Sequence, residues 1–146
     1  MMLLGPAKHT SDRIETKREL KSLGYQKVII MEEYLDQEND YSLDDKFRRI
    51  LKENPDYYFA MFYNGAEMDG VTFEIGWLCG MFSRLIIREK LIILSEFGYN
   101  WNSTTSYIAS LFPNKVHYIP FDKTKDGFTI FDGIHAFMKS PKGRAS

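Results

Sequence analysis

The sequence contains very little cysteine and no long uninterrupted apolar segment. Cys79 is the only cysteine among 146 residues, so the chain cannot form an intrachain disulfide or a zinc site built from several cysteines. Because disulfides are rare in the cytosol, a chain that forms none is expected to be cytoplasmic. The longest apolar run, residues 85–94, is interrupted by charged residues at 88–90, and the sequence therefore predicts no membrane span.

The chain also lacks an excess of charge of either sign. Its 19 Lys and Arg residues nearly balance 20 Asp and Glu residues, which leaves a formal net charge of −1. Nucleic-acid-binding domains usually present a basic face, so no nucleic-acid partner is expected. The three histidines lie far apart in the sequence and predict no metal site; they are His9, His117 and His135.

The length and the 44% content of hydrophobic residues suit one globular domain. We expect residues 1–139 to form that domain. Residues 140–146, with the polar sequence SPKGRAS, are expected to be a flexible tail.

Short apolar segments alternate with helical patterns along the chain. The apolar segments predict strands at residues 2–4, 28–31, 57–62, 90–94 and 116–119. Such alternation is typical of parallel strands joined by right-handed crossovers. The sequence therefore predicts a three-layer, flavodoxin-like (Rossmann-like) α/β sandwich. Its five-stranded parallel sheet is expected to have the order 2-1-3-4-5.

The first predicted helix begins at Thr10 or Ser11, either of which can cap it. It carries Ile14, Leu20 and Leu23 on one face, and Gly24 ends it. Further helices are predicted at residues 42–52, 71–82, 103–112 and 128–138.

Ligands of open parallel sheets bind beyond the carboxyl ends of the strands, where the strand order reverses. Polar loops at residues 5–12, 64–70 and 96–103 are expected to meet there. Candidate ligand contacts in them are His9, Asn64 and Ser103. Each also has a structural interpretation: a solvated loop residue, a turn residue and a helix cap, respectively.

Glu74 is the strongest candidate for catalysis, because it lies in an otherwise apolar helical segment between Phe73 and Ile75. Desolvation there would raise the pKa of its carboxyl group and prepare it for proton transfer or nucleophilic attack. The alternative is a glutamate that is favoured near a helix N-terminus by the helix dipole.

Residues 70–76, GVTFEIG, resemble the signature Gly-[Thr/Val]-x-x-Glu-[Leu/Ile]-Gly of the nucleoside 2-deoxyribosyltransferase superfamily, including its nucleoside 5′-monophosphate N-glycosidase branch. Residues 3–6, 55–62 and 90–94 are similar to the family's first strand and turn and to the strands on either side of the signature helix. The resemblance implies that Glu74 is a nucleophile at the sugar C1′ of a nucleoside or nucleotide. It also implies a homodimer or larger homo-oligomer and no cofactor.

The resemblance further implies that the residues around the signature and the first turn contact the substrate; these are Gly5, Pro6, Asp69, Gly70 and Val71. The family's aspartate six residues before the nucleophile corresponds to Met68, with Asp69 one place later. Its aspartate near the start of the second helix corresponds to Arg48. Asp44 and Asp45 are the nearest carboxylates, and Asp45 is taken as the second catalytic candidate.

Two other functions are compatible with the sequence. TIR-like domains share the flavodoxin-like layout and cleave NAD with a helix-borne glutamate, but their Trp and Cys precede that glutamate, whereas Trp77 and Cys79 follow Glu74. A nucleotide-sensing domain that has lost its chemistry would explain the departures from the family's aspartate positions.

Overall fold

The structure is a computed structural model of the chain, and it describes residues 1–30, 48, 52–53, 55–83, 90–99 and 110–144. A five-stranded sheet with all strands parallel has the order β2-β1-β3-β4-β5. This confirms the predicted flavodoxin-like α/β fold and its strand order. The strands are β1 (Met2–Leu4), β2 (Ile29–Ile30), β3 (Tyr57–Phe62), β4 (Lys90–Glu96) and β5 (Val116–Phe121).

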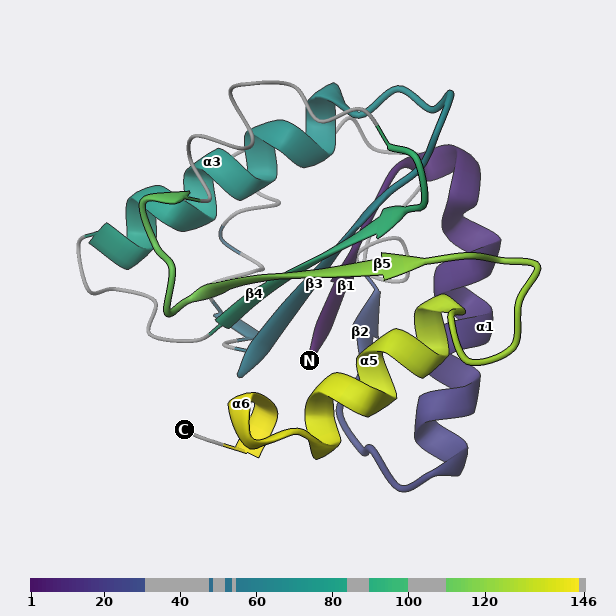
Figure 1. Cartoon of the computed structure of the whole chain (residues 1–146). Coiled ribbons are helices and arrows are strands. Elements are labelled where there is room, and N and C mark those ends of the chain that lie inside the picture. The colour runs from purple at the N-terminus through teal and green to yellow at the C-terminus, as the bar shows by residue number, and fades with distance from the viewer. Residues whose placement is uncertain (31–47, 49–51, 54, 84–89, 100–109, 145–146) are drawn as a thin grey trace.

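Helices cover both faces of the sheet (Figure 1). Helix α3 (Asp69–Ser83) lies on one face, and α1 (Thr10–Ser22) and α5 (Ile130–Lys139) lie on the other. A short 3-10 helix, η1 (Ala7–His9), precedes α1. From β1 the chain passes to β2 on one side of it and then to β3 on the other side. The direction in which successive strands are added therefore reverses, and the reversal lies between β1 and β3.

Strand β1 shows how alternate residues supply two separate cores. Met2 and Leu4 belong to the core under α3, together with Val71 and Ile75 of that helix. Leu3 belongs to the opposite core, under α1 and α5. Both faces of the central strands are therefore buried, which explains why β3 and β4 are nearly continuous apolar runs in the sequence.

Helix α1 buries a different face from the predicted one. Leu20 is buried as expected, but Ile14 is 53% exposed and Leu23 is 52% exposed. The buried positions beside Leu20 are Arg13 and Thr16. The prediction was wrong because it ranked the face by apolar residues alone, whereas the hydrogen bonds of Arg13, described below, select the face that meets the sheet.

Helix α5 (Ile130–Lys139) lies close to the predicted helix at residues 128–138. The Thr129 side chain caps the helix by accepting a hydrogen bond from the backbone N–H of Asp132, whose carboxylate accepts one in return from the Thr129 N–H. Its buried residues are Ile130, Ile134 and Phe137. The tail predicted from Ser140 onward contains a short helix, α6 (Pro141–Arg144), and the Tyr57 hydroxyl donates to the carbonyl of Gly143. The predicted helices at residues 42–52 and 103–112 lie largely outside the described residues.

Candidate functional site

The candidate binding residues of the first turn and the third strand lie at the carboxyl edge of the sheet. Gly5 and Pro6 directly follow β1, and Asn64 lies two residues after the end of β3. His9 is the last residue of η1. The structure thus brings the loops after β1 and β3 to the point where the strand order reverses, as predicted for a ligand site.

Glu74 lies in the second turn of α3, a helix that begins at this edge. Its side chain is only 4% exposed. It shares the buried face of the helix with Val71, Ile75 and Leu78, all of which belong to the core against the sheet. Because Cα–Cβ bonds in a helix tilt toward its N-terminus, the Glu74 side chain leaves the backbone in the direction of the carboxyl edge.

The other signature residues open the same helix. Asp69 and Gly70 form its exposed first residues, and Val71 is buried. The backbone N–H of Thr72 donates to the carbonyl of Met68 at 2.9 Å, which is the first bond of the helix ladder. The predicted catalytic residue Asp45 and the predicted contact Ser103 lie outside the described residues.

A buried arginine supports the turn after β1. Arg13 is completely buried, and its guanidinium donates to the carbonyl of Pro6 at 3.0 Å and to the Thr10 hydroxyl at 3.1 Å. A longer contact of 3.5 Å reaches the carbonyl of His9. A Cβ at Gly5 would lie 2.4 Å from Nη1 of Arg13, so this turn and the guanidinium require a residue without a side chain.

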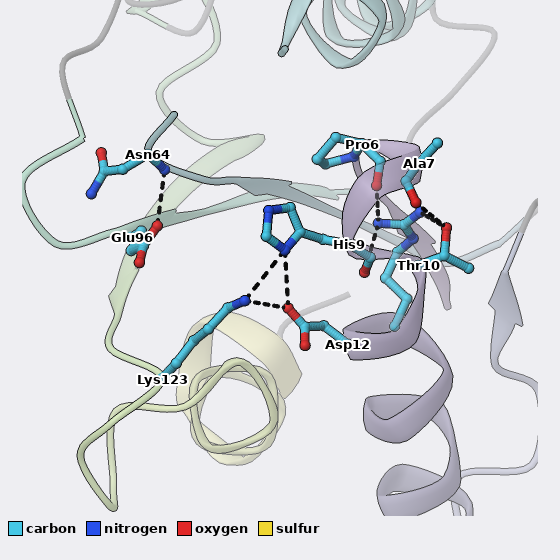
Figure 2. Close-up of polar contacts among 9 residues, drawn as sticks. Pro6, Ala7, His9, Thr10, Asp12, Asn64, Glu96 and Lys123 are labelled. Atoms are coloured by element: carbon cyan, nitrogen blue, oxygen red, sulfur yellow. Dashed lines mark hydrogen bonds and ion pairs between the residues drawn. The ribbon is translucent and has the colours of Figure 1, made fainter. Parts of the chain in front are cut away.

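One cluster consists of four side chains from three parts of the chain: His9, Asp12, Tyr63 and Lys123. The His9 imidazole stacks on the Tyr63 ring, with the centroids 3.8 Å apart and the planes 4° from parallel. Figure 2 shows Lys123 and Asp12 on the same side of the imidazole, next to Nδ1. Lys123 Nζ lies 3.3 Å from His9 Nδ1 and 2.8 Å from Asp12 Oδ2, and it also lies 4.7 Å from the centroid of the Tyr63 ring.

A second polar contact joins β3 to β4 at this edge. The Glu96 carboxylate accepts a hydrogen bond of 2.9 Å from the backbone N–H of Asn64, and the Asn64 side-chain amide donates to the carbonyl of Phe97 at 2.9 Å (Figure 2). Asn64 therefore has a structural function in joining the two strand ends, whether or not it also contacts a ligand.

We call the cluster of His9, Asp12, Tyr63 and Lys123 the His9 cluster. Its surroundings shift the pKa values of His9, Asp12 and Tyr63. Burial and the nearby Lys123 ammonium lower the pKa of His9. Burial by itself would raise the pKa of Asp12. The hydrogen bond and charge of Lys123, together with the nearby Tyr63 hydroxyl, lower it by more than burial raises it, so the net change is downward. Burial and the Asp12 charge raise the pKa of Tyr63. Asp12 is therefore ionised at neutral pH while His9 and Tyr63 are uncharged.

Several cavities border α5, and two of them lie along its N-terminal part or its length. One, of ≈ 240 Å³, lies between α1 and the start of α5 and has three carboxylates in its wall; its lining residues are Asp12, Glu15, Thr16, Glu19, Lys123, Thr129, Ile130 and Phe131. The other, of ≈ 620 Å³, follows the outer edge of β5 along α5. Glu74 lines neither of them.

No family model, curated protein or solved structure matches this chain. A function is therefore argued from the side chains themselves. Within the described residues, no helix is both long and apolar enough to cross a membrane. The same residues contain no group of three or more His, Cys, Asp or Glu side chains placed to hold a metal ion.

Sequence reasoning singled out His9 but missed the residues that hold it. Lys123 is 114 positions away in the chain, and its only signal is that it follows the last strand of the sheet. Tyr63 was interpreted as one of several aromatic core or wall residues. Arg13 and Asp12 had no signal beyond their place after the first turn, because no periodic pattern distinguishes a buried charged residue from a solvated one.

Proposed function

We propose that this protein cleaves the N-glycosidic bond of a nucleoside or nucleotide, or transfers the sugar to a second base, with Glu74 as the nucleophile. One observation carries the proposal: Glu74 is a carboxylate 4% exposed in the second turn of a helix that begins at the carboxyl edge of the sheet. The resemblance of residues 70–76 to the deoxyribosyltransferase signature supports the same role.

The chemistry requires a carboxylate held close to the anomeric carbon. As the C1′–N bond breaks, its electron pair leaves with the base, which takes up a proton, and positive charge develops on the sugar. A Glu74 oxygen then forms a bond to C1′ and gives a glycosyl ester. Water, or the nitrogen of a second base, attacks C1′, releases the carboxylate and returns a proton to the group that protonated the leaving base.

Burial of Glu74 favours this role because water competes poorly for a carboxylate that is fixed against the sheet. The adjacent residues Gly70 and Phe73 are exposed, and Phe73 is a large apolar side chain with 55% of its surface accessible. An exposed glycine and an exposed aromatic ring beside a buried carboxylate offer close backbone approach and an apolar surface to a nucleoside. The second catalytic candidate Asp45, the homo-oligomer and the cytosolic location remain predictions.

The direct test is release of free base from purified protein. The protein is incubated with ribo- and deoxynucleosides, their 5′-monophosphates and NAD, and the products are separated by liquid chromatography. We expect base release from at least one nucleoside or nucleotide, and Glu74→Gln to reduce the rate at least ~10³-fold, as loss of a nucleophile does in other enzymes. The matched control is Glu67→Gln, an exposed glutamate just before the same helix, which should retain the full rate.

A 2-fluoro-2-deoxynucleoside, whose fluorine slows hydrolysis of the glycosyl ester, provides a second readout. We expect intact-protein mass spectrometry to detect the sugar adduct and peptide mapping to place it on Glu74. Equal base release by wild type and Glu74→Gln would contradict the proposal. Cleavage restricted to NAD would favour the TIR-like alternative, and thermal stabilisation by nucleotides without any turnover would favour a sensing domain.

A further inference from the structure

The two ring nitrogens of His9 have different surroundings. Nδ1 lies 3.3 Å from Lys123 Nζ and 3.6 Å from Asp12 Oδ2. Nε2 lies on the opposite side of the ring, away from Asp12 and Lys123 (Figure 2), and within the described part of the chain it forms no hydrogen bond. One nitrogen of this imidazole is thus held by the protein, and the other has no hydrogen-bond partner among the described residues.

Lys123 determines which nitrogen carries the proton. An ammonium group has three donors and no acceptor, so Nδ1 can form a hydrogen bond with it only through a lone pair. The Lys123 ammonium also contacts Asp12 at 2.8 Å, which orients it. Neutral His9 therefore carries its proton on Nε2. The lowered pKa of His9 agrees with this neutral form.

The position of the ring is fixed as well as its proton. Tyr63, which is 1% exposed, supports one face of the imidazole in a parallel stack. The Arg13 guanidinium holds the turn that carries His9, through the carbonyl of Pro6 and the Thr10 hydroxyl. His9 is thus held at its backbone, at one face of its ring and at one ring nitrogen. A side chain held in this way loses little conformational entropy when its other ring nitrogen binds a ligand.

We propose that His9 is a ligand-binding residue that donates the Nε2 hydrogen to an oxygen acceptor of the substrate, with Lys123 and Asp12 as its positioning residues. This inference rests on the proposed function, which makes the substrate a nucleoside or nucleotide. Two kinds of oxygen fit a neutral N–H donor: a phosphate oxygen, and a carbonyl or hydroxyl oxygen of the nucleoside part. A cation does not fit, because Nε2 carries a hydrogen and has no lone pair available.

The tautomer is tested without any substrate. Long-range ¹⁵N–¹H correlation spectra of the ¹⁵N-labelled full chain distinguish a protonated ring nitrogen from one with a lone pair. At neutral pH we expect His9 to be neutral with the proton on Nε2, and Lys123→Met to give a mixture of both tautomers. Lys125→Met, in the same loop but outside the His9 cluster, is the control and should leave the spectrum unchanged. A His9 that is protonated, or that carries its proton on Nδ1, in the wild-type protein would overturn the inference.

Ligand contact is tested with His9→Phe, which keeps a flat ring on Tyr63 but lacks the N–H. Binding of each nucleoside of the panel and of its 5′-monophosphate is measured by calorimetry in a Glu74→Gln background, which prevents turnover during the titration. We expect the dissociation constant to rise about tenfold, as for loss of one buried hydrogen bond, with an unchanged melting temperature. A rise confined to the 5′-monophosphate assigns the acceptor to phosphate, and an equal rise for nucleoside and nucleotide assigns it to the nucleoside part.

The two proposals fail in different ways. Base release that depends on Glu74 but binding that is unchanged in His9→Phe would overturn the inference about His9 and leave the proposed function intact. Nucleotide binding that His9→Phe weakens, without base release by the wild-type protein, would overturn the proposed function and support the binding role of His9.

Discussion

Helices α1 and α3 lie on opposite faces of one sheet, and each buries one charged side chain near the carboxyl edge. In α3 the buried charge is Glu74, surrounded by apolar residues that the sequence pattern already marks as buried. In α1 it is Arg13, which lies next to the 53% exposed Ile14. An apolar pattern therefore locates the buried face of a helix rich in apolar residues, but fails for a helix in which hydrogen bonds decide the packing.

The physical reason lies in what surrounds each position. The start of α1 packs under a turn that offers the carbonyls of Pro6 and His9 and the Thr10 hydroxyl as acceptors. Arg13 has five donors in a planar fork and can reach all three. Burial of its charge is compensated by these contacts, whereas Ile14 in the same place would leave the acceptors without a donor.

The largest effect is expected from a pair of isoleucine truncations that contrasts the two helices. Ile75→Ala removes a completely buried side chain of α3 and should lower the free energy of unfolding by about 2–5 kcal/mol. Ile14→Ala, on α1, should change it by less than about 0.5 kcal/mol. Urea unfolding followed by circular dichroism measures both. Similar losses for the two variants would show that Ile14 is buried, against the structure.

The next largest effect concerns Arg13. Arg13→Met keeps the length of the side chain but removes every donor, and we expect the free energy of unfolding to fall by about 2–4 kcal/mol because the acceptors of the turn are left unpaired. Arg18→Met, at a position where the side chain is 77% exposed, is the matched control and should be nearly neutral. The same urea titration compares them, and a neutral Arg13→Met would show that the guanidinium does not hold the turn.

A smaller effect separates two glycines of the candidate site. Gly5→Ala forces a Cβ against Arg13 Nη1, 2.4 Å away, and should lower stability by about 1–3 kcal/mol. At Gly70 a Cβ meets nothing within 4 Å. Gly70→Ala in the first turn of α3 should therefore be neutral or stabilise the protein by up to ~1 kcal/mol. Differential scanning calorimetry should rank the melting temperatures as Gly70→Ala, wild type and Gly5→Ala, and the reverse order would contradict the structure.

The smallest expected effect is a pH dependence from the His9 cluster. Because burial and Lys123 lower the pKa of His9 below 6.5, the unfolded chain binds the His9 proton more readily than the folded protein. Stability is therefore full above 6.5 and decreases as the pH falls toward the folded pKa. The groups facing the imidazole are Lys123, Asp12, Lys8 and Glu96. The pKa of Asp12 is already lowered from 3.8, so its titration lies below this window.

Urea midpoints of wild type and His9→Gln at about pH 7.5 and about pH 5.5 measure this dependence. The wild-type protein should lose more stability between the two values than His9→Gln does. An equal loss in both would mean that the pKa of His9 is the same in the folded and the unfolded chain.

The sequence predicted the arrangement of strands well because burial on both faces leaves a direct trace, as in residues 57–62 and 90–94. It also predicted the burial of Glu74, since a single carboxylate among Val71, Ile75 and Leu78 lies on an apolar helix face. The His9 cluster was predicted only through His9. Two of its partners are Tyr63, directly after β3, and Lys123, in the loop after β5. No local pattern connects either of them to His9, because they are 54 and 114 positions away.

By itself, the sequence determined the alternation of strands and helices, the parallel sheet and the helix that carries Glu74, because these depend on periodic burial and on residues close in the chain. Only the tertiary structure decided which face of α1 meets the sheet, why Gly5 has no room for a side chain, and which nitrogen of His9 carries a proton. Those depend on contacts between distant segments, where one hydrogen bond to a buried acceptor outweighs the local preference of the helix.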